Sequence, residues 1–272
     1  TQKTAYELGV RLVGSEMYIR DRPIYLAAYL YDKSLPISLK HTFISIIIIG
    51  VSFFLIVFQP DLGTSIVVLL AGFYVLFLAG LSWKFIGSAV AVFILSLPFL
   101  WNNLLAPFQR QRVATLFNPE VDPFGTGWNI TQSKIAIGSG GIFGKGYGSG
   151  SQAHLDFLPE TKTDFIFAVI VEEFGLVGGL MVIFLFALLV LGIFKTSIKA
   201  LELGKLFQGL LAFGAGILIA IQVVFNIGVN LGILPTKGLT LPFISYGGTS
   251  LILFMFLMGL VLRINFENKT IK

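Results

Sequence analysis

Long apolar runs separated by short polar connections dominate the chain. Between residues 42 and 109 the only charged residues are Asp61 and Lys84, and between residues 206 and 262 the only one is Lys237. A transmembrane helix needs roughly 20 mostly apolar residues. The pattern therefore predicts an all-α, polytopic membrane helix bundle that forms a single membrane domain over residues 1–272. The expected spans lie at about 42–58, 64–81, 84–105, 165–194, 206–230 and 247–264.

The first 41 residues contain no clear span. Residues 23–31 (PIYLAAYLY) are apolar but short and follow the charged run 20–22, so we expect a helix there whose depth in the membrane stays open. The chain starts without Met and without the charged-then-apolar layout of a signal peptide. We therefore expect that it does not begin where its gene does.

Charge and composition narrow the class of protein. Charged residues make up 12% of the 272 positions, against about 25% in a soluble domain, which argues against a water-soluble enzyme. The net charge is +5, but the basic residues lie between apolar runs, so they indicate membrane orientation rather than nucleic-acid binding. The absence of cysteine and the presence of only two histidines exclude disulfides and thiolate chemistry and disfavour a histidine-rich metal site.

Lys and Arg residues in the connections predict the orientation. If residues 32–41 are cytoplasmic, nine basic residues fall on the cytoplasmic side and six on the outer side, five of these in one long loop where the rule is weak. The C-terminus is then cytoplasmic. The nine are Lys33, Lys40, Lys84, Lys195, Lys199, Lys205, Arg263, Lys269 and Lys272.

The connection 106–163 is far longer than the about 12 to 15 residues above which loops are usually functional or disordered. Its apolar content favours a structured extracytoplasmic loop, and nine glycines between residues 125 and 150 suit tight turns and close approach of backbone to a ligand. These glycines match neither GxGxxG nor a P-loop. An active-site loop and a re-entrant structural plug both remain open.

Three cations belong to this region. Arg110 and Arg112 lie two residues apart, so an extended segment would project both guanidinium groups to one side, where they suit phosphate oxygens. Lys134 is a third cation. Contact with lipid headgroups is an equally good interpretation of all three.

Carboxylates begin two of the expected spans on the same outer side. Asp164 precedes one span and Asp61 another; each is a candidate for chemistry and also a candidate helix cap. Glu160 lies just before Asp164, and Glu172 lies about two turns deeper, at membrane depth, where acidic groups are functional by default.

A polar stripe runs along the span 206–230, because Gln222, Asn226 and Asn230 recur every four residues. Hydrogen bonding between helices is the favoured interpretation, since amides are poor acids and bases. The Gly- and Pro-rich connection 231–247 that follows predicts irregular backbone that lines a cavity or is buried in protein.

Carboxylates, cations and a glycine-rich loop beside lipid suit one chemistry in particular. A lipid-diphosphate sugar donor needs cations to hold the diphosphate and a general base to take a proton from the acceptor hydroxyl.

Five segments carry a specific resemblance: FQPDLGTS (58–65), QRQR (109–112), residues 118–146, residues 155–178, and GILPTKGLTLPFISYGGTS (232–250). Together they are similar to the SEDS family (shape, elongation, division, sporulation), and most similar to its cell-elongation branch. The resemblance implies a peptidoglycan glycosyltransferase that polymerises lipid II at the outer face of the bacterial cytoplasmic membrane, for elongation and rod shape. It also implies a class B penicillin-binding protein as partner, and membrane lipid rather than nucleic acid as surroundings.

The resemblance also implies roles for individual residues. Asp164 matches the family's essential acidic residue, which we expect to be the general base, and Arg110, Arg112 and Lys134 would hold the diphosphates. Glu16 matches a glutamate on a cavity-lining helix, although the residues around it depart from the family pattern. The remaining expected substrate-binding residues are Asp61, Ser133 and Glu160.

Some expectations stay open at this level. A divalent cation, Mg or Mn, is a possible cofactor, with no metal ligands assigned. The resemblance implies a protein of ten helices, and roughly the first three of these have no counterpart in this sequence. A flippase or transporter of lipid-linked precursors, and a non-catalytic scaffold for a penicillin-binding protein, are the alternative functions.

Overall fold

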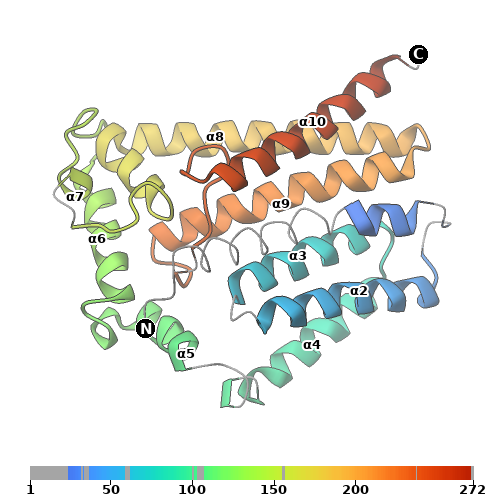
Figure 1. Ribbon diagram of the computed structural model, residues 1–272, viewed down its shortest axis with the longest axis horizontal. Helices are drawn as coiled ribbons and strands as arrows, with labels where there is room; N and C mark the ends of the chain where they lie inside the picture. The colour runs from blue at the N-terminus through green and yellow to red at the C-terminus, as the bar shows by residue number, and fades with distance from the viewer. Residues whose placement is uncertain are drawn as a thin grey trace. The chain divides into compact units, whose positions relative to one another are not determined.

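The computed structural model describes residues 24–31, 33, 37–58, 62–99, 101–102, 107–154, 157–236 and 238–270. All regular secondary structure in these ranges is helical, which confirms the all-α prediction (Figure 1). A short helical segment covers residues 24–30. The elements that follow are α2 (Leu39–Val57), α3 (Leu62–Leu78), α4 (Trp83–Phe99), α5 (Pro107–Phe117), the 3-10 helix η2 (Pro119–Val121), α6 (Thr126–Ser139), α7 (Ser151–His154), α8 (Ile166–Glu202), α9 (Leu206–Asn230) and α10 (Gly248–Thr270).

Four helices in the described part of the chain are long and apolar enough to cross a membrane. They are Lys40–Val57, Ile166–Glu202, Leu206–Asn230 and Gly248–Thr270. The expected spans at 64–81 and 84–105 correspond to the shorter helices α3 and α4, each of 17 residues. A helix of that length extends about 25 Å, slightly less than the hydrocarbon core of a bilayer.

The expected single membrane domain is built from two compact units. The first unit comprises the described residues within Thr1–Ser82, Phe186–Gln222 and Gly247–Lys272, and the second those within Trp83–Leu185 and Val223–Tyr246. Every described candidate site residue lies in the second unit.

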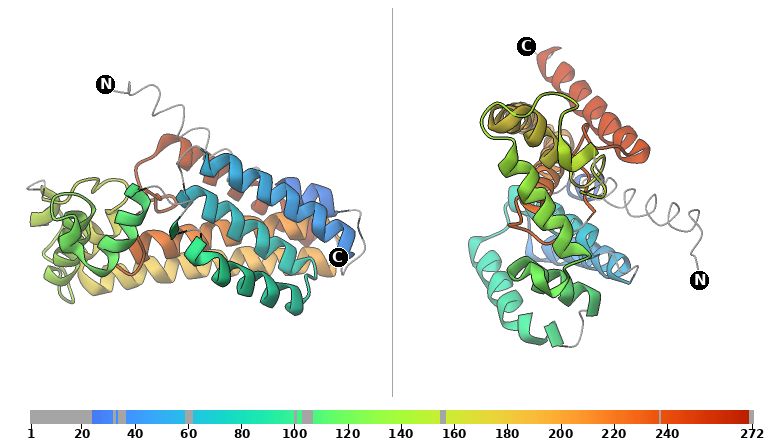
Figure 2. Two further views of the ribbon diagram at one scale, coloured as in Figure 1. Left: turned by 90° about the horizontal axis from the view of Figure 1, so that it is seen from below. Right: turned by 90° about the vertical axis from the view of Figure 1, so that its left-hand side faces the viewer.

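Small residues allow close helix packing in the first unit. The helices α2 and α3 lie side by side (Figure 2), and a Cβ added to Gly72 would meet the Ile49 side chain at 2.8 Å. At the turn between α8 and α9, the Ser197 hydroxyl donates to the Gly209 carbonyl over 2.7 Å. Glycine and serine therefore bring the helix backbones together, as in other membrane bundles.

The long connection 106–163 folds into helices of its own in the second unit. It forms α5, η2, α6 and α7 rather than an irregular loop. Ile130 and Leu158 are buried in the packing of this unit, whereas large apolar side chains such as Phe124 and Phe143 are exposed. The core of this unit contains the buried residues Ala136, Leu158, Phe165, Ala168 and Val229, against which Ile137 and Leu234 pack.

The glycine-rich segment after α6 packs against an interruption in α8. Gly175 has φ 70° and ψ −169°, which breaks the helical hydrogen-bond pattern. The carbonyls of Glu172 and Glu173 accept from the amides of Lys145 (3.0 Å) and Gly146 (2.9 Å). A Cβ at Gly144 would clash with the Glu173 carbonyl. We expected these glycines to bring backbone close to a ligand; in the structure they bring it close to α8, where the broken helix needs new hydrogen-bond donors.

Candidate functional site

Asp164 lies in the turn that leads into α8, and its backbone is held from α9. Its carbonyl accepts hydrogen bonds from the side-chain amides of Asn226 (3.0 Å) and Asn230 (2.9 Å). The Asn230 carbonyl oxygen Oδ1 in turn accepts from the amide of Ala168 (2.9 Å), in the first turn of α8. The two asparagines therefore fix both Asp164 and the start of the helix that follows it.

The turn before Asp164 is built around Glu160. Its φ of 54° is unusual for a residue other than glycine and is a source of backbone strain. Its carbonyl accepts from the amides of Thr163 (3.1 Å) and Phe165 (3.2 Å), and its carboxylate accepts from the Thr163 hydroxyl (2.8 Å). These bonds hold the turn closed and place two carboxylates, Glu160 and Asp164, in the same short segment.

The carboxyl group of Asp164 is electrostatically perturbed. Burial raises its pKa from 3.8 to about 6, the negative charge of Glu160 also raises it, and the positive charge of Arg112 lowers it. A carboxylate with a pKa near 6 retains more basicity than an ordinary aspartate and is still ionised at neutral pH, which suits a general base.

The structure corrects the expected arrangement of the two arginines. They lie in the helix α5 rather than in an extended segment, so residues two apart point about 200° around the axis from one another. Arg110 donates to the Asn102 carbonyl over 2.9 Å. The charge of Arg112 acts on Asp164 and lowers its pKa. The helix therefore separates the roles of two residues that the sequence treats as a pair.

Two neighbours on α6 also take different positions. The Lys134 side chain is exposed and lies against Gly232, so that a Cβ added there would clash with its Cε atom. Ser133 is fully buried, and its hydroxyl donates to the Asn230 carbonyl over 2.7 Å. Lys134 can meet a ligand, whereas Ser133, which we expected to bind substrate, links α6 to α9 and presents no exposed atom.

On the polar stripe of α9, the expected interhelical hydrogen bond is confirmed for Asn230, which accepts from the Ala168 amide of α8. Asn226 instead donates to the carbonyls of Asp164 and Leu239, which lie outside the helices. Ser245 was not among the predicted residues; its hydroxyl donates to the Thr163 carbonyl over 2.6 Å. The only sequence feature that pointed to this region was the Gly- and Pro-rich composition of the connection 231–247.

Glu172, the acidic residue at membrane depth, has a cationic partner. Its fully buried carboxylate forms an ion pair with Lys145 (2.7 Å) and accepts from the Ser151 hydroxyl (3.1 Å) and the Gln152 amide (3.1 Å). These contacts fasten the glycine-rich segment and α7 to α8. The ion pair therefore stabilises the fold around the site.

We expect Lys145→Ala to lower the free energy of unfolding by about 3 kcal/mol, because the buried Glu172 carboxylate loses the cation that balances it. Thermal melting of the purified protein in detergent measures this. Lys195→Ala, at an exposed lysine, is the matched control. Equal melting temperatures for the two variants would show that the ion pair is not needed for stability.

The remaining predicted residues cannot be placed. Asp61 and Glu16 lie outside the described residues. Among the described residues no group of three or more His, Cys, Asp or Glu side chains could hold a metal ion.

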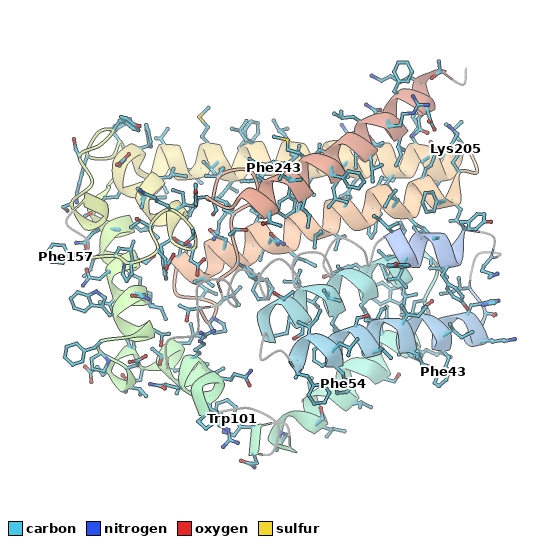
Figure 3. The ribbon with its side chains drawn as sticks, in the orientation of Figure 1. Phe43, Phe54, Trp101, Phe157, Lys205 and Phe243 are labelled. Carbon is cyan, nitrogen blue, oxygen red and sulfur yellow. The ribbon has the colours of Figure 1, made fainter. Side chains whose placement is uncertain are left out.

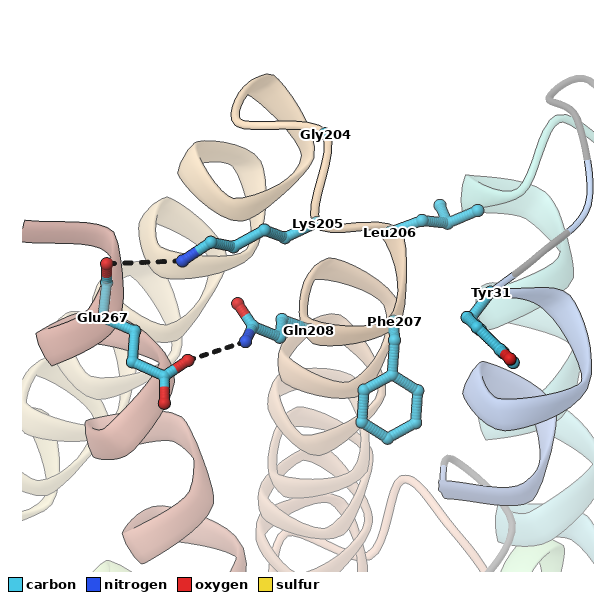
Figure 4. Close-up of a pocket in the computed structure, with 7 residues that line it drawn as sticks. All are labelled: Tyr31, Gly204, Lys205, Leu206, Phe207, Gln208 and Glu267. Atoms are coloured by element: carbon cyan, nitrogen blue, oxygen red, sulfur yellow. Dashed lines mark hydrogen bonds between the residues drawn. The ribbon is translucent and has the colours of Figure 1, made fainter. Parts of the chain in front are cut away.

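A cavity of about 350 Å³ lies in the first unit rather than beside Asp164 (Figure 4). Within it, Gln208 donates to the Glu267 carboxylate (2.8 Å) and the Lys205 ammonium donates to the Glu267 carbonyl (3.3 Å). Its lining residues are Tyr31, Gly204, Lys205, Leu206, Phe207, Gln208 and Glu267. No predicted site residue is among them.

Comparison with known protein families gives one match over almost the whole chain. The model described as "cell cycle protein", named for FtsW, RodA and SpoVE, matches residues 9–270. The peptidoglycan glycosyltransferase MrdB of Escherichia coli K12 is 45% identical over 261 residues, which cover 96% of this chain and 70% of MrdB.

Two solved structures are similar to this chain. One, from a study of how a peptidoglycan synthase complex coordinates polymerization and crosslinking, has a TM-score of 0.74 at 31% identity and covers 93% of this chain and 70% of its own. The other is a point mutant of the Thermus thermophilus rod shape determining protein RodA, with a TM-score of 0.63 at 28% identity, covering 93% and 66%.

Proposed function

Because the chain belongs to the FtsW/RodA/SpoVE family, the SEDS family, and is a peptidoglycan glycosyltransferase, we propose that it polymerises lipid II with Asp164 as general base. Asp164 takes a proton from the acceptor sugar's hydroxyl while that oxygen attacks the anomeric carbon of the donor. The new glycosidic bond forms, the bond from the anomeric carbon to the diphosphate breaks, and the diphosphate leaves with its lipid.

One observation carries this assignment: a half-buried carboxylate, with a pKa near 6, whose charge interacts with a guanidinium. General acid–base catalysis needs the first feature, and a leaving diphosphate needs a cation such as the second. Arg112 is therefore the principal diphosphate-binding residue of the proposal. The exposed Lys134 and the half-buried Arg110 are further cations. Glu160 raises the basicity of Asp164, while Asp61 and Glu16 stay predicted substrate-binding residues.

A divalent cation fits this site only as a companion of the substrate. Asp164 and Glu160 supply two carboxylates, fewer than a protein cage needs, and Mg²⁺ at phosphate sites commonly uses one or two carboxylates with phosphate oxygens and water. There it would neutralise charge on the leaving diphosphate. Arg112, a residue of this chain, would neutralise the same charge without a metal ion.

The proposed setting is the bacterial cytoplasmic membrane, with the site facing outward and the C-terminus in the cytoplasm. The excess of Lys and Arg in the connections on one side supports this orientation. A class B penicillin-binding protein is the proposed partner, and the similarity to a chain from a peptidoglycan synthase complex supports it.

The test is glycan synthesis by the purified protein from lipid II in detergent, with the penicillin-binding protein present and absent. We expect glycan strands that a muramidase digests. A protein that binds lipid II but never extends it, even with the partner present, would favour the flippase or the scaffold, and transport of lipid II across a vesicle bilayer would single out the flippase.

The pH dependence of polymerisation should follow the ionisation of Asp164. Because its pKa is near 6 and the base must be ionised, the rate is expected to fall about tenfold per pH unit below 6 and to level off above it. Initial rates between pH 5 and 8 measure this. Glu160→Gln removes a charge that raises the pKa, so its midpoint should move to lower pH. Coinciding midpoints for wild type and Glu160→Gln would contradict the assignment of this titration to Asp164.

A further inference from the structure

The three residues that end at Asp164 are held by donors from a single distant segment. The segment runs from the last turn of α9 through the connection to α10, and we call its described residues 226–236 and 238–246 the α9–α10 segment. Three successive carbonyls each accept from it: Lys162 from the Tyr246 amide (2.8 Å), Thr163 from the Ser245 hydroxyl (2.6 Å), and Asp164 from the Asn226 and Asn230 amides (3.0 and 2.9 Å).

The same segment also reaches the reactive carboxylate. A Cβ built on Gly238, whose φ is 62°, would lie 3.5 Å from the Asp164 oxygen Oδ2. Asn226 is nearly fully buried, and its amide donates both to the Asp164 carbonyl and to the Leu239 carbonyl (2.8 Å). One side chain thus joins the backbone of Asp164 to the backbone that lies against its carboxylate.

Ser245 performs a similar double task at the other end of the segment. Its hydroxyl accepts from the Leu241 amide (2.7 Å) and donates to the Thr163 carbonyl (2.6 Å). The turn that it closes contains Phe243 (Figure 3). The φ of Phe243 is 64°, which is unusual for a residue with a side chain. The hydroxyl therefore holds a strained turn and attaches that turn to the residue before Asp164.

We propose that Asn226 and Ser245 are positioning residues for the reaction: through the α9–α10 segment they fix where the Asp164 carboxylate lies. This inference rests on the proposed role of Asp164 as general base. A base must lie within about 3 Å of the oxygen whose proton it takes, and a misplacement of about 1 Å can lower a rate about 100-fold. In this proposal neither side chain touches the substrate. Replacing either one should therefore lower kcat and leave KM nearly unchanged.

The experiment compares polymerisation of lipid II by Ser245→Ala, Ser245→Thr and Asn226→Ala with the wild type. We expect Ser245→Ala and Asn226→Ala to lower kcat about 10- to 100-fold while KM for lipid II changes less than about twofold. Ser245→Thr keeps the hydroxyl and should recover most of the rate. The pH midpoint of Ser245→Ala should also move, because a displaced Asp164 meets Glu160 and Arg112 at new distances.

Ser197→Ala is the matched control for a merely structural loss. It also removes a serine hydroxyl that donates to a backbone carbonyl (2.7 Å), but that bond lies in the first unit. We expect it to lower the melting temperature and to leave kcat and the pH midpoint of the folded protein unchanged. If Ser245→Ala and Asn226→Ala behave like Ser197→Ala, the positioning role is wrong. If Ser245→Ala does not fold, Asn226→Ala decides by the same criteria.

Asp164→Asn separates this inference from the proposed function. If Asp164→Asn is inactive while Ser245→Ala and Asn226→Ala keep the wild-type kcat, the positioning role fails and the general base stands. If Asp164→Asn keeps its activity, the general base itself is wrong and the positioning role is lost with it.

Discussion

Asp164→Asn is expected to abolish glycan polymerisation, by at least about a thousandfold, while the protein stays folded and still binds lipid II. The amide cannot accept the acceptor hydroxyl's proton, yet it has nearly the shape of the carboxyl group. The backbone carbonyl of Asp164 keeps its bonds from Asn226 and Asn230. Gel analysis of muramidase-sensitive glycan, with lipid II binding measured in parallel, gives the result.

The same substitution should raise stability at neutral pH. The folded-state pKa of Asp164 is raised, so its favourable contribution is complete below pH 3.8 and is lost as the pH rises through about 6. Above that pH the half-buried carboxylate destabilises the fold by about 2 to 3 kcal/mol. The neutral amide removes this penalty, so Asp164→Asn should melt at a higher temperature than the wild type at pH 7.5 and at nearly the same temperature near pH 4.

Glu120→Gln is the control, because it neutralises an exposed carboxylate in the same unit. It should leave both activity and melting temperature close to wild type. An Asp164→Asn protein that polymerises lipid II at a tenth of the wild-type rate or faster would exclude Asp164 as the general base.

The second large effect is expected at Arg112. Arg112→Ala should lower kcat/KM for lipid II about 100- to 1000-fold, because the developing diphosphate charge loses a fixed cation. It should also move the pH midpoint above 6, since the Arg112 charge lowers the pKa of Asp164. Arg112→Lys keeps the charge without the planar fork of donors and should recover the midpoint better than the rate. Steady-state kinetics across pH 5 to 8 measure both effects.

Arg110→Ala provides the comparison within the same helix. Its guanidinium donates to the Asn102 carbonyl over 2.9 Å, whereas the charge of Arg112 lowers the pKa of Asp164. We expect Arg110→Ala to lower kcat/KM for lipid II less than about tenfold and to move the pH midpoint less than Arg112→Ala does. Equal losses for Arg110→Ala and Arg112→Ala would show that helix α5 does not separate the roles of the two residues.

The mispredicted arginine pair shows where sequence patterns stop being informative. The alternation in QRQR suits an extended segment, but in the structure these four residues are part of the helix Pro107–Phe117. Proline is favoured at the first position of a helix, and that local signal was available. The sequence contained no signal for which arginine acts on Asp164, because that depends on how α5 packs.

The glycines after α6 show the same limit. Their density predicts close backbone approach, but not what is approached. The partner is the interrupted helix α8, in particular the carbonyls of Glu172 and Glu173, about thirty residues further along the chain. Local sequence does not encode such a pairing.

By itself the sequence determined the membrane class and the long apolar helices, because the length of apolar runs is a local property. Asp164 became the leading candidate through the resemblance of the surrounding segments to the SEDS family. Only the tertiary structure decided that Arg112 and Glu160 set the pKa of Asp164 and that Asn226 and Ser245 hold it. The reason is physical: Asn226 is 62 residues away from Asp164 along the chain and Ser245 is further still, Arg112 acts from helix α5, and Glu160, although close in sequence, acts through the fold of the turn that buries Asp164. Direction and distance between side chains are fixed by packing, which no periodic pattern records.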